Sequence, residues 1–144
     1  LRAGRGCWMT SDDIISIARE TLGTPFRHQG RVVGVGLDCA GVALYVAGRL
    51  GLETLDVVGY GTTPANGMLE EVLDQQPCLI EVNDRQPGDI LLMRIFHEPQ
   101  HLAIFTGGTI IHSYANVGIC CEHDLDDRWK SLIIKAYRFI GVEL

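Results

Sequence analysis

Apolar residues recur every three or four positions in the N-terminal half of the chain, a period that predicts amphipathic helices. The predicted helices span residues 11–22, 39–50 and 66–76. Thr10 and Asp38, directly before the first two, and Asn66, the first residue of the third, are of types that cap helix N-termini. Glycine directly follows the first two segments, as expected where a helix ends.

The pattern changes after the turn signal "QPGD", where β-branched and alternating segments predict strands. These segments are "ILLMRIF", "HLAIFT", "TIIHSY", "VGICCEH" and "LIIKAYRFI". Helices followed by strands favour an α+β fold, with helices packed on one face of a central antiparallel sheet. We expect a single domain over residues 9–144, preceded by an extension over residues 1–8.

A glycine-rich segment over residues 26–37 separates the first two helices and predicts a loop without a stable element. It leads to Cys39, at the start of the second helix. Unpaired backbone N–H groups and the helix dipole favour a thiolate there, which is typical of a nucleophilic cysteine. A small buried core residue is the alternative, and position alone leaves both interpretations open.

The segment "HLAIFTGGTIIHSY" predicts a β-hairpin closed by its two adjacent glycines. In that register Ala103 pairs with His112 and His101 pairs with Tyr114, so both histidines share a face. They could be zinc ligands, structural histidines, or a base and its orienting group. No further ligand has convincing spacing for zinc, and the hairpin geometry does not decide between the other two.

Composition and charge exclude some classes of function. The chain has 12 Lys and Arg against 18 Asp and Glu, a net charge of −6, and no basic cluster. We therefore expect no nucleic-acid partner. Its apolar runs are shorter than the roughly 20 residues that span a bilayer, so we expect no membrane insertion. The segment "LRAGRGCWMT" lacks the apolar core of a secretory signal, which predicts synthesis in the cytoplasm without a signal peptide.

The five cysteines are irregularly spaced, which predicts reduced thiols rather than a disulfide framework. Cys120 and Cys121 are neighbours in a predicted strand, so their side chains point to opposite faces and a metal pair is not expected. His123 lies at the polar end of that strand and is predicted to be solvated. We expect neither a metal site nor a cofactor.

Two long stretches resemble the NlpC family of cysteine peptidases, which are papain-like bacterial cell-wall endopeptidases. They are "LGTPFRHQGRVVGVGLDCAGVALYV" and "QPGDILLM…HLAIFTGGTIIHSY". The resemblance spans roughly residues 11–139. Within the family, "GTPFRHQ", "GVGLDC" and the closing "IIKAYRF" are most similar to the phage-tail and gene-transfer-agent branch.

The resemblance implies a papain-like fold and a catalytic triad formed by Cys39, His101 and His112. Cys39 would attack a peptide carbonyl, and His101 would act as general acid and base. His112 would hold His101 in the correct tautomer and orientation.

The resemblance also implies a substrate and a location. The substrate would be a peptidoglycan stem peptide, cleaved between D-glutamate and the diamino acid. The partners would be phage-tail proteins, with the enzyme carried in a virion tail or encoded by a prophage and acting on the cell wall. Two alternatives remain open: a related thiol amidase or acyltransferase, and a non-catalytic tail-assembly module with a vestigial triad.

Substrate-binding residues are expected around the cysteine at Phe26, Arg27, His28, Asp38 and Ala40. Two of them depart from the family pattern. Phe26 stands where the family commonly has Tyr, so a hydroxyl near the cysteine is missing. Ala40 stands where Ser is frequent and helps some members to recognise their substrate.

Overall fold

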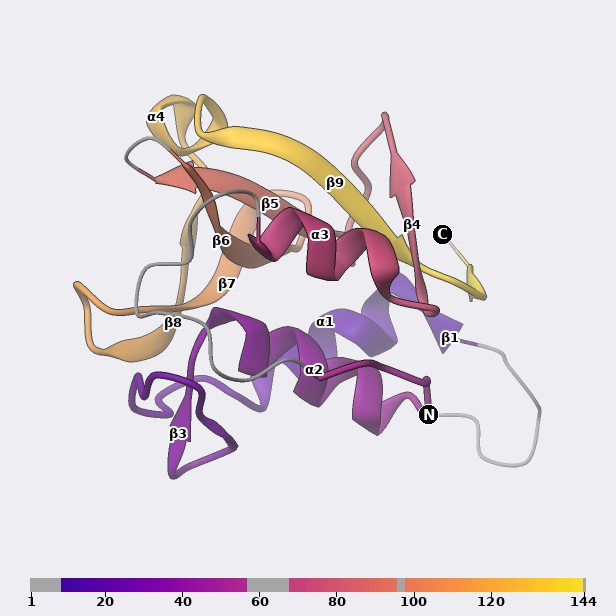
Figure 1. Cartoon of the computed structure of the whole chain (residues 1–144). Coiled ribbons are helices and arrows are strands. Elements are labelled where there is room, and N and C mark those ends of the chain that lie inside the picture. Colours follow the sequence, from indigo (N-terminus) through magenta and orange to yellow (C-terminus); the bar gives the residue numbers. More distant parts are fainter. Residues whose placement is uncertain (1–8, 57–67, 96–97, 144) are drawn as a thin grey trace.

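A six-stranded antiparallel sheet runs through the molecule, in the strand order β4-β9-β5-β6-β7-β8 (Figure 1). Its strands are β4 (Leu79–Val82), β5 (Ile90–Ile95), β6 (Glu98–Phe105), β7 (Thr109–Tyr114), β8 (Ile119–Asp124) and β9 (Ile133–Phe139). The structure, a computed structural model, describes residues 9–56, 68–95 and 98–143. The predicted extension over residues 1–8 and the predicted cap Asn66 lie outside the described residues.

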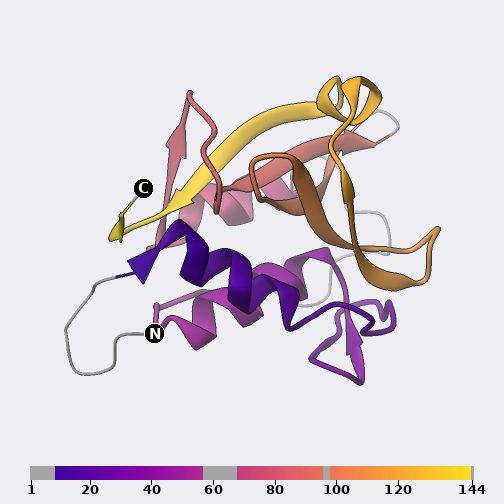
Figure 2. The ribbon, with the colours of Figure 1, turned by 180° about the vertical axis from the view of Figure 1, so that it is seen from behind.

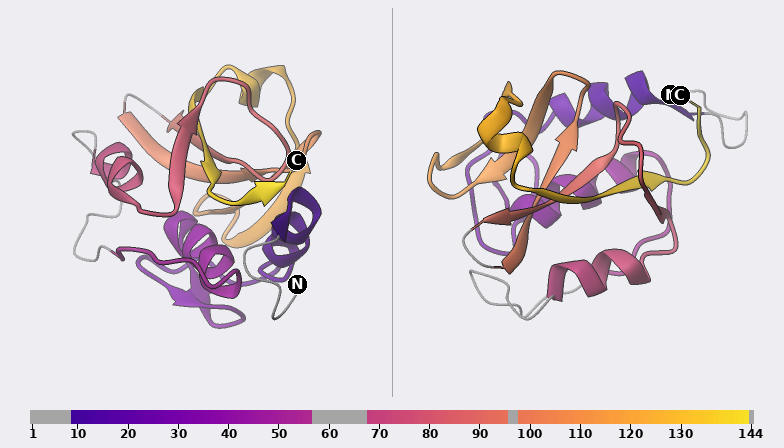
Figure 3. Two further views of the ribbon diagram at one scale, coloured as in Figure 1. Left: turned by 90° about the vertical axis from the view of Figure 1, so that its right-hand side faces the viewer. Right: turned by 90° about the horizontal axis from the view of Figure 1, so that it is seen from above.

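Three helices cover one face of the sheet: α1 (Ser11–Arg19), α2 (Cys39–Arg49) and α3 (Met68–Gln75). Helices α1 and α2 run side by side beneath the sheet, as Figures 1 and 2 show from opposite directions. Helix α3 contacts strands β4 and β6 and lies at one side of the molecule, as the left view of Figure 3 shows. The predicted α+β class is confirmed. Within the described part of the chain, no helix has the length and apolar character needed to cross a bilayer.

Strand alternation gives the sheet two buried faces with different partners. The face that includes Leu102 and Ile104 packs against α1, α2 and α3. The opposite face includes Ala103 and Phe105, and it packs against Trp129 of the short helix α4 (Asp127–Lys130). Both faces of β6 are therefore buried, which explains the almost unbroken apolar sequence after His101.

Two minor ladders complete the fold. Strand β1 (Met9–Thr10) pairs in parallel with β10 (Val142–Glu143), which ties the first described residues to the last ones. Within the segment predicted to lack any element, β2 (Arg31–Val32) pairs with β3 (Gly36–Leu37). That prediction was wrong because Gly34 adopts a φ of 81° and reverses the chain between these strands, so its flexibility closes a turn.

The first helix also ends earlier than predicted, at Arg19 rather than at residue 22.

This glycine-rich loop packs directly against the start of α2. A Cβ atom on Gly41 would lie 2.3 Å from the Gly30 carbonyl oxygen, and one on Gly30 would lie 2.5 Å from the Gly36 oxygen. Only glycine permits such close approach of backbone to backbone. The loop and the helix start are thus held at a fixed distance.

The Gly41→Ala variant should be less stable, because its methyl group must displace the Gly30 backbone. Overpacking of this kind costs about 1–3 kcal/mol, and each 1 kcal/mol lowers the melting temperature of a domain this size by roughly 2–4 °C. Thermal unfolding followed by circular dichroism measures the change.

Gly48→Ala is the matched control in the same helix, because a Cβ there meets no atom within 4 Å. Alanine in an exposed helical position should stabilise the protein by about 0.5–1 kcal/mol. Equal melting temperatures for the two variants would contradict the close-packing interpretation.

Candidate active site

The start of α2 is fixed by the carboxylate of Asp38, which is only 4% exposed. One carboxylate oxygen accepts hydrogen bonds from the Gly41 backbone N–H and from Arg31, each at 2.8 Å. The other accepts from the backbone N–H of Gln29 at 3.0 Å. Asp38 was predicted both as a helix cap and as a substrate-binding residue. The structure confirms the cap, and these protein donors occupy its carboxylate.

Cys39 is the first residue of α2, and its thiol lies against strand β6. The residue as a whole is partly exposed, yet burial of the thiol, assisted by the negative charge of Asp38, raises the pKa of Cys39 to about 12. Hydrogen bonds from the backbone amides of Leu102 and Ala40 favour the thiolate but are outweighed. At this position desolvation of the thiol outweighs the effect of the helix start on its pKa.

The hairpin between β6 and β7 has the predicted register where it closes, with Phe105 opposite Ile110 and Ile104 opposite Ile111. Beyond those pairs the ladder stops among the described residues, so the predicted Ala103–His112 and His101–Tyr114 pairs are not formed. Residues of β6 and β7 make other contacts beyond this point.

At the point where the strands separate, a group on β6 binds the start of α2 and a group on β7 binds the loop before it. The N–H of Leu102 faces β7, because that of Phe105, an odd number of residues away, bonds Asp89 on the β5 side. The Leu102 N–H donates a hydrogen bond to the Cys39 sulfur. On β7, the Ser113 hydroxyl donates to the Leu37 carbonyl at 2.6 Å. The sheet thus opens where the cysteine approaches it.

Three histidines form a hydrogen-bonded chain across β6, β7 and β8. His101 Nε2 lies 2.6 Å from His112 Nδ1, and His112 Nε2 lies 2.8 Å from His123 Nε2. His123 Nδ1 in turn lies 2.9 Å from the carbonyl oxygen of Asp124. His101 and His112 therefore share a face of the sheet, as predicted.

The carbonyl at the end of this chain fixes the tautomer of each neutral ring, because a carbonyl can only accept. His123 must carry its proton on Nδ1, so its Nε2 accepts from His112. His112 Nδ1 then accepts from His101 Nε2. The remaining lone pair of His101 is on Nδ1, as required of a general base.

Both buried histidines are neutral at pH 7. Burial, assisted by the nearby His123, lowers the pKa of His101 to about 4. Burial, assisted by His101 and His123, lowers that of His112 to about 2. No hydrogen bond among the described residues joins the Cys39 thiol to the His101 ring. The resting site therefore holds a neutral thiol and a neutral imidazole. The thiol is hydrogen-bonded to the backbone N–H of Leu102, the residue that follows His101 in β6.

Aromatic side chains surround the histidine chain. The Tyr114 ring stacks on His112 with 5.4 Å between centroids. Trp129 makes edge contact with His112 at 5.3 Å and lies 4.8 Å from the His123 ring. These contacts restrict rotation of the imidazoles.

The other predicted substrate-binding residues lie at the loop and at the helix. Phe26 is half-buried and bridges to Leu37, whereas Arg27 and His28 are exposed. Ala40 follows Cys39 and lines a pocket between α2 and α3. The departure from Ser at this position gives that wall of the pocket an apolar surface.

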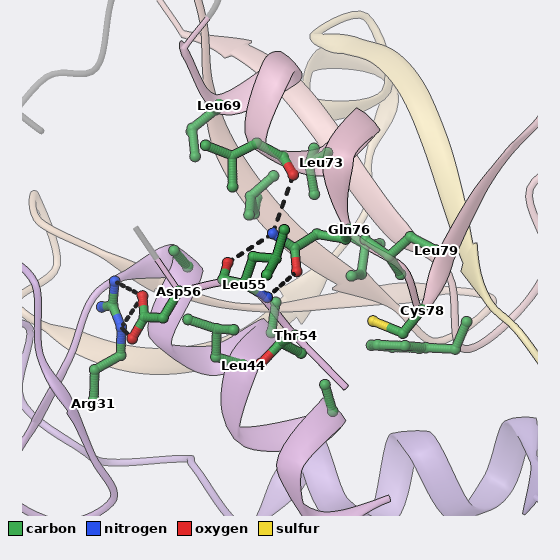
Figure 4. A pocket seen from close by; sticks show the side chains of 17 residues that line it. Arg31, Leu44, Thr54, Leu55, Asp56, Leu69, Leu73, Gln76, Cys78 and Leu79 are labelled. Carbon is green, nitrogen blue, oxygen red and sulfur yellow. Dashed lines mark hydrogen bonds and ion pairs between the residues drawn. The ribbon is translucent and has the colours of Figure 1, made fainter. Parts of the chain in front are cut away.

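This pocket is apolar, and its lining includes Leu102 and Ala40, the residue that follows Cys39 in the sequence. Figure 4 shows the pocket from close by. Leucines from α2, α3 and neighbouring segments form much of the wall, namely Leu44, Leu55, Leu69, Leu73 and Leu79. The Gln76 side chain donates to the Leu55 carbonyl and accepts from the Leu55 backbone N–H, which holds that wall in place. The pocket is suited to an apolar part of a ligand.

Sequence reasoning missed the contribution of β8. In the β7–β8 ladder Cys121 lies directly opposite His112, and His123 follows two residues later on the same face. The spacing Cys-x-His in a predicted strand was a signal for a shared face. Its relation to His112 depends on a register between strands that the intervening loop does not reveal.

No protein-family model and no curated protein sequence matches this chain. Solved structures do. An NlpC/p60 family protein from Bacillus cereus superposes with a TM-score of 0.67 at 20% identity, over 92% of this chain and 41% of that one. The NlpC/p60 domain of the peptidoglycan hydrolase SagA matches with a TM-score of 0.61 at 22% identity, over 89% of this chain and 97% of that one.

The chain has the NlpC/p60 fold. Proteins with this fold differ in activity: RipD from Mycobacterium tuberculosis is a non-catalytic NlpC/p60 domain protein adapted to peptidoglycan binding. It matches with a TM-score of 0.57 at 16% identity, over 90% of this chain and 96% of that one. The present chain spans less than half the length of the Bacillus cereus protein.

The raised pKa of Cys39 predicts slow alkylation at neutral pH. Below its pKa a thiol is deprotonated in a fraction that grows about tenfold per pH unit. The rate with iodoacetamide should therefore rise about tenfold per unit from pH 7 to pH 9 without a plateau. Mass spectrometry of the Cys39 peptide measures the rate.

The peptide containing Cys121 gives a comparison within the same sample, because residue Cys121 is partly exposed, as residue Cys39 is. A Cys39 rate that levels off near pH 7 would mean that the thiolate exists at rest, contrary to the structure.

Proposed function

We propose that this protein is a cysteine peptidase that cleaves peptide bonds in peptidoglycan stem peptides. The observation that carries the proposal is the histidine pair on β6 and β7, with His101 Nδ1 free to accept a proton beside the helix start that presents Cys39. The NlpC/p60 fold and the likeness to the peptidoglycan hydrolase SagA support the substrate class.

The reaction would proceed from the neutral pair. As the Cys39 sulfur bonds to the peptide carbonyl carbon, its proton moves to His101 Nδ1. His112 Nδ1 accepts from the second N–H of the imidazolium so formed. The Cys39 backbone N–H, at the start of α2, would stabilise the oxyanion. His101 then protonates the leaving amine and activates the water that hydrolyses the thioester.

The apolar pocket beside Ala40 supports a substrate with an apolar portion near the scissile bond. Within stem peptides, the bond between D-glutamate and the diamino acid is the one that the sequence resemblance favours. The same resemblance supports a phage-tail or prophage setting, in which a protein made in the cytoplasm acts on the cell wall from a virion tail. A thiol amidase would use the same residues on another substrate.

A non-catalytic peptidoglycan-binding role, with phage-tail assembly as its setting, is the second candidate. The observation that favours it is the protonated resting thiol, which has no hydrogen bond to His101 among the described residues. RipD shows that this fold can serve binding without catalysis.

Digestion of purified peptidoglycan tests the first proposal. The wild-type protein should release muropeptide fragments, with masses that identify the bond, and Cys39→Ala should release none. His101→Ala should lower the rate by at least about 100-fold, the range typical of general acid–base catalysis.

Cys120→Ser is the matched control, because Cys120 points to the opposite face of β8 and contacts Thr21. It should cleave like the wild type. Equal product from the wild type and Cys39→Ala would overturn the peptidase proposal, and sedimentation of the intact protein with insoluble peptidoglycan would then support the binding role.

A further inference from the structure

Three residues whose side chains can bind a metal ion lie together on the face of the sheet that carries His101 and His112. His112, Cys121 and His123 each offer one ligand atom, and these atoms all lie within 4.8 Å of one another. The β7–β8 register produces this arrangement, because it sets Cys121 opposite His112 and His123 on the same side of β8. His112 is buried, whereas Cys121 and His123 are partly exposed, which gives an ion access from solvent.

We propose that His112, Cys121 and His123 bind a zinc ion, with a water molecule as the fourth ligand. Imidazole nitrogen and thiolate sulfur are ligands that zinc prefers, and three protein ligands with one open position form a common zinc arrangement. Bonds of about 2.0 Å to nitrogen require a separation of roughly 3.3 Å between two nitrogens in a tetrahedron. His112 Nε2 and His123 Nε2 lie 2.8 Å apart, so these two nitrogens must move apart by about 0.5 Å to bind one ion together.

The surroundings of His123 match those of a metal ligand. Its Nδ1 donates to the Asp124 carbonyl at 2.9 Å, which leaves the Nε2 lone pair directed at the site. Ligating histidines characteristically donate their second N–H to such an acceptor. Trp129 lies against the rings of both His112 and His123 and holds their orientation.

A zinc ion at this position takes the place of the proton on His112 Nε2, which is hydrogen-bonded to His123 Nε2 in the metal-free protein. His112 then carries its proton on Nδ1 and donates to His101 Nε2, the reverse of the metal-free direction. His101 must hold its own proton on Nδ1, the atom that the proposed mechanism uses as a base. In both rings the proton moves from Nε2 to Nδ1, so neither ring gains or loses a proton overall. The Cys121 thiol releases one proton to solvent.

Zinc should therefore inhibit peptide hydrolysis reversibly. This consequence depends on the proposed peptidase function, but binding of the ion does not. Binding is therefore measured in the Cys39→Ala background, which is catalytically inactive under the proposal and also removes any zinc site built on Cys39 and His101.

Cobalt(II) provides the direct readout, since a cobalt–thiolate bond absorbs in the near ultraviolet. Cys39→Ala protein should bind one equivalent of cobalt with this band, and zinc should displace it. Competition against a chromophoric chelator gives the zinc affinity. Adding Cys121→Ser should abolish the band and weaken zinc binding by at least about 10-fold, the smallest loss typical even of outer-shell changes.

Cys120→Ser in the same background is the matched control, and it should keep both the band and the affinity, because Cys120 faces the opposite side of β8. His123→Gln is a second test that does not alter a thiol, and it should weaken zinc binding. Circular dichroism establishes that each variant is folded.

The proposal is overturned if folded Cys39→Ala binds no cobalt, or if the thiolate band survives Cys121→Ser. With the wild type, zinc should stop the release of muropeptides and a chelator should restore it, whereas Cys121→Ser should need at least about 10-fold more zinc. Active protein that binds zinc without inhibition overturns the tautomer argument alone. An inactive wild type that binds zinc through Cys121 refutes the peptidase function and leaves the metal site supported.

Discussion

The buried carboxylate of Asp38 is the constraint on which the site depends. A charge that is almost completely buried is stable only where donors compensate it. Here the donors come from α2, through Gly41, and from the loop before it, through Gln29 and Arg31. The loop and the helix start therefore form one unit, and the position of the thiol follows from it. The close backbone approach between Gly30 and Gly41 reinforces the same unit, because no side chain could fit there.

The separation of β6 from β7 links this unit to the histidines. Leu102 packs toward α2, whereas strand alternation turns the neighbouring His101 to the other face. The cysteine therefore meets the edge of the strand that carries the proposed base, at the point where the two strands part. If the β6–β7 ladder continued past Ile104 and Ile111, the Leu102 N–H would donate to β7, and the Cys39 sulfur would lose that hydrogen bond. Incomplete pairing is thus part of how the site is built.

A single backbone carbonyl determines the protonation pattern of three imidazoles. Because the Asp124 oxygen can only accept, the proton positions on His123, His112 and His101 follow in order. The pattern leaves the lone pair that the proposed mechanism uses on His101, the ring farthest from that carbonyl. At the His123 end of this hydrogen-bonded chain of histidines, a cation could change the protonation of His101 without contacting the substrate. The proposed catalysis and the proposed zinc site therefore both use His112 and compete for it.

The sequence by itself determined the features that local physics controls. Asp38 before an apolar stripe was sufficient to begin α2 at Cys39, and two glycines between alternating segments were sufficient to close the β6–β7 hairpin in the correct register. The order of helices and strands was sufficient for the fold class. These features depend on neighbours within a few residues, so composition and spacing reveal them.

Tertiary structure alone decided the pKa of Cys39, the parting of β6 from β7 and the position of β8 beside His112. Each depends on groups that are distant in sequence. Burial of the thiol requires β6 to pack on α2, and the approach of Cys121 and His123 requires a register between two strands. The extent of desolvation and the register between strands both depend on the packing of the whole chain. A local sequence pattern therefore predicts neither of them.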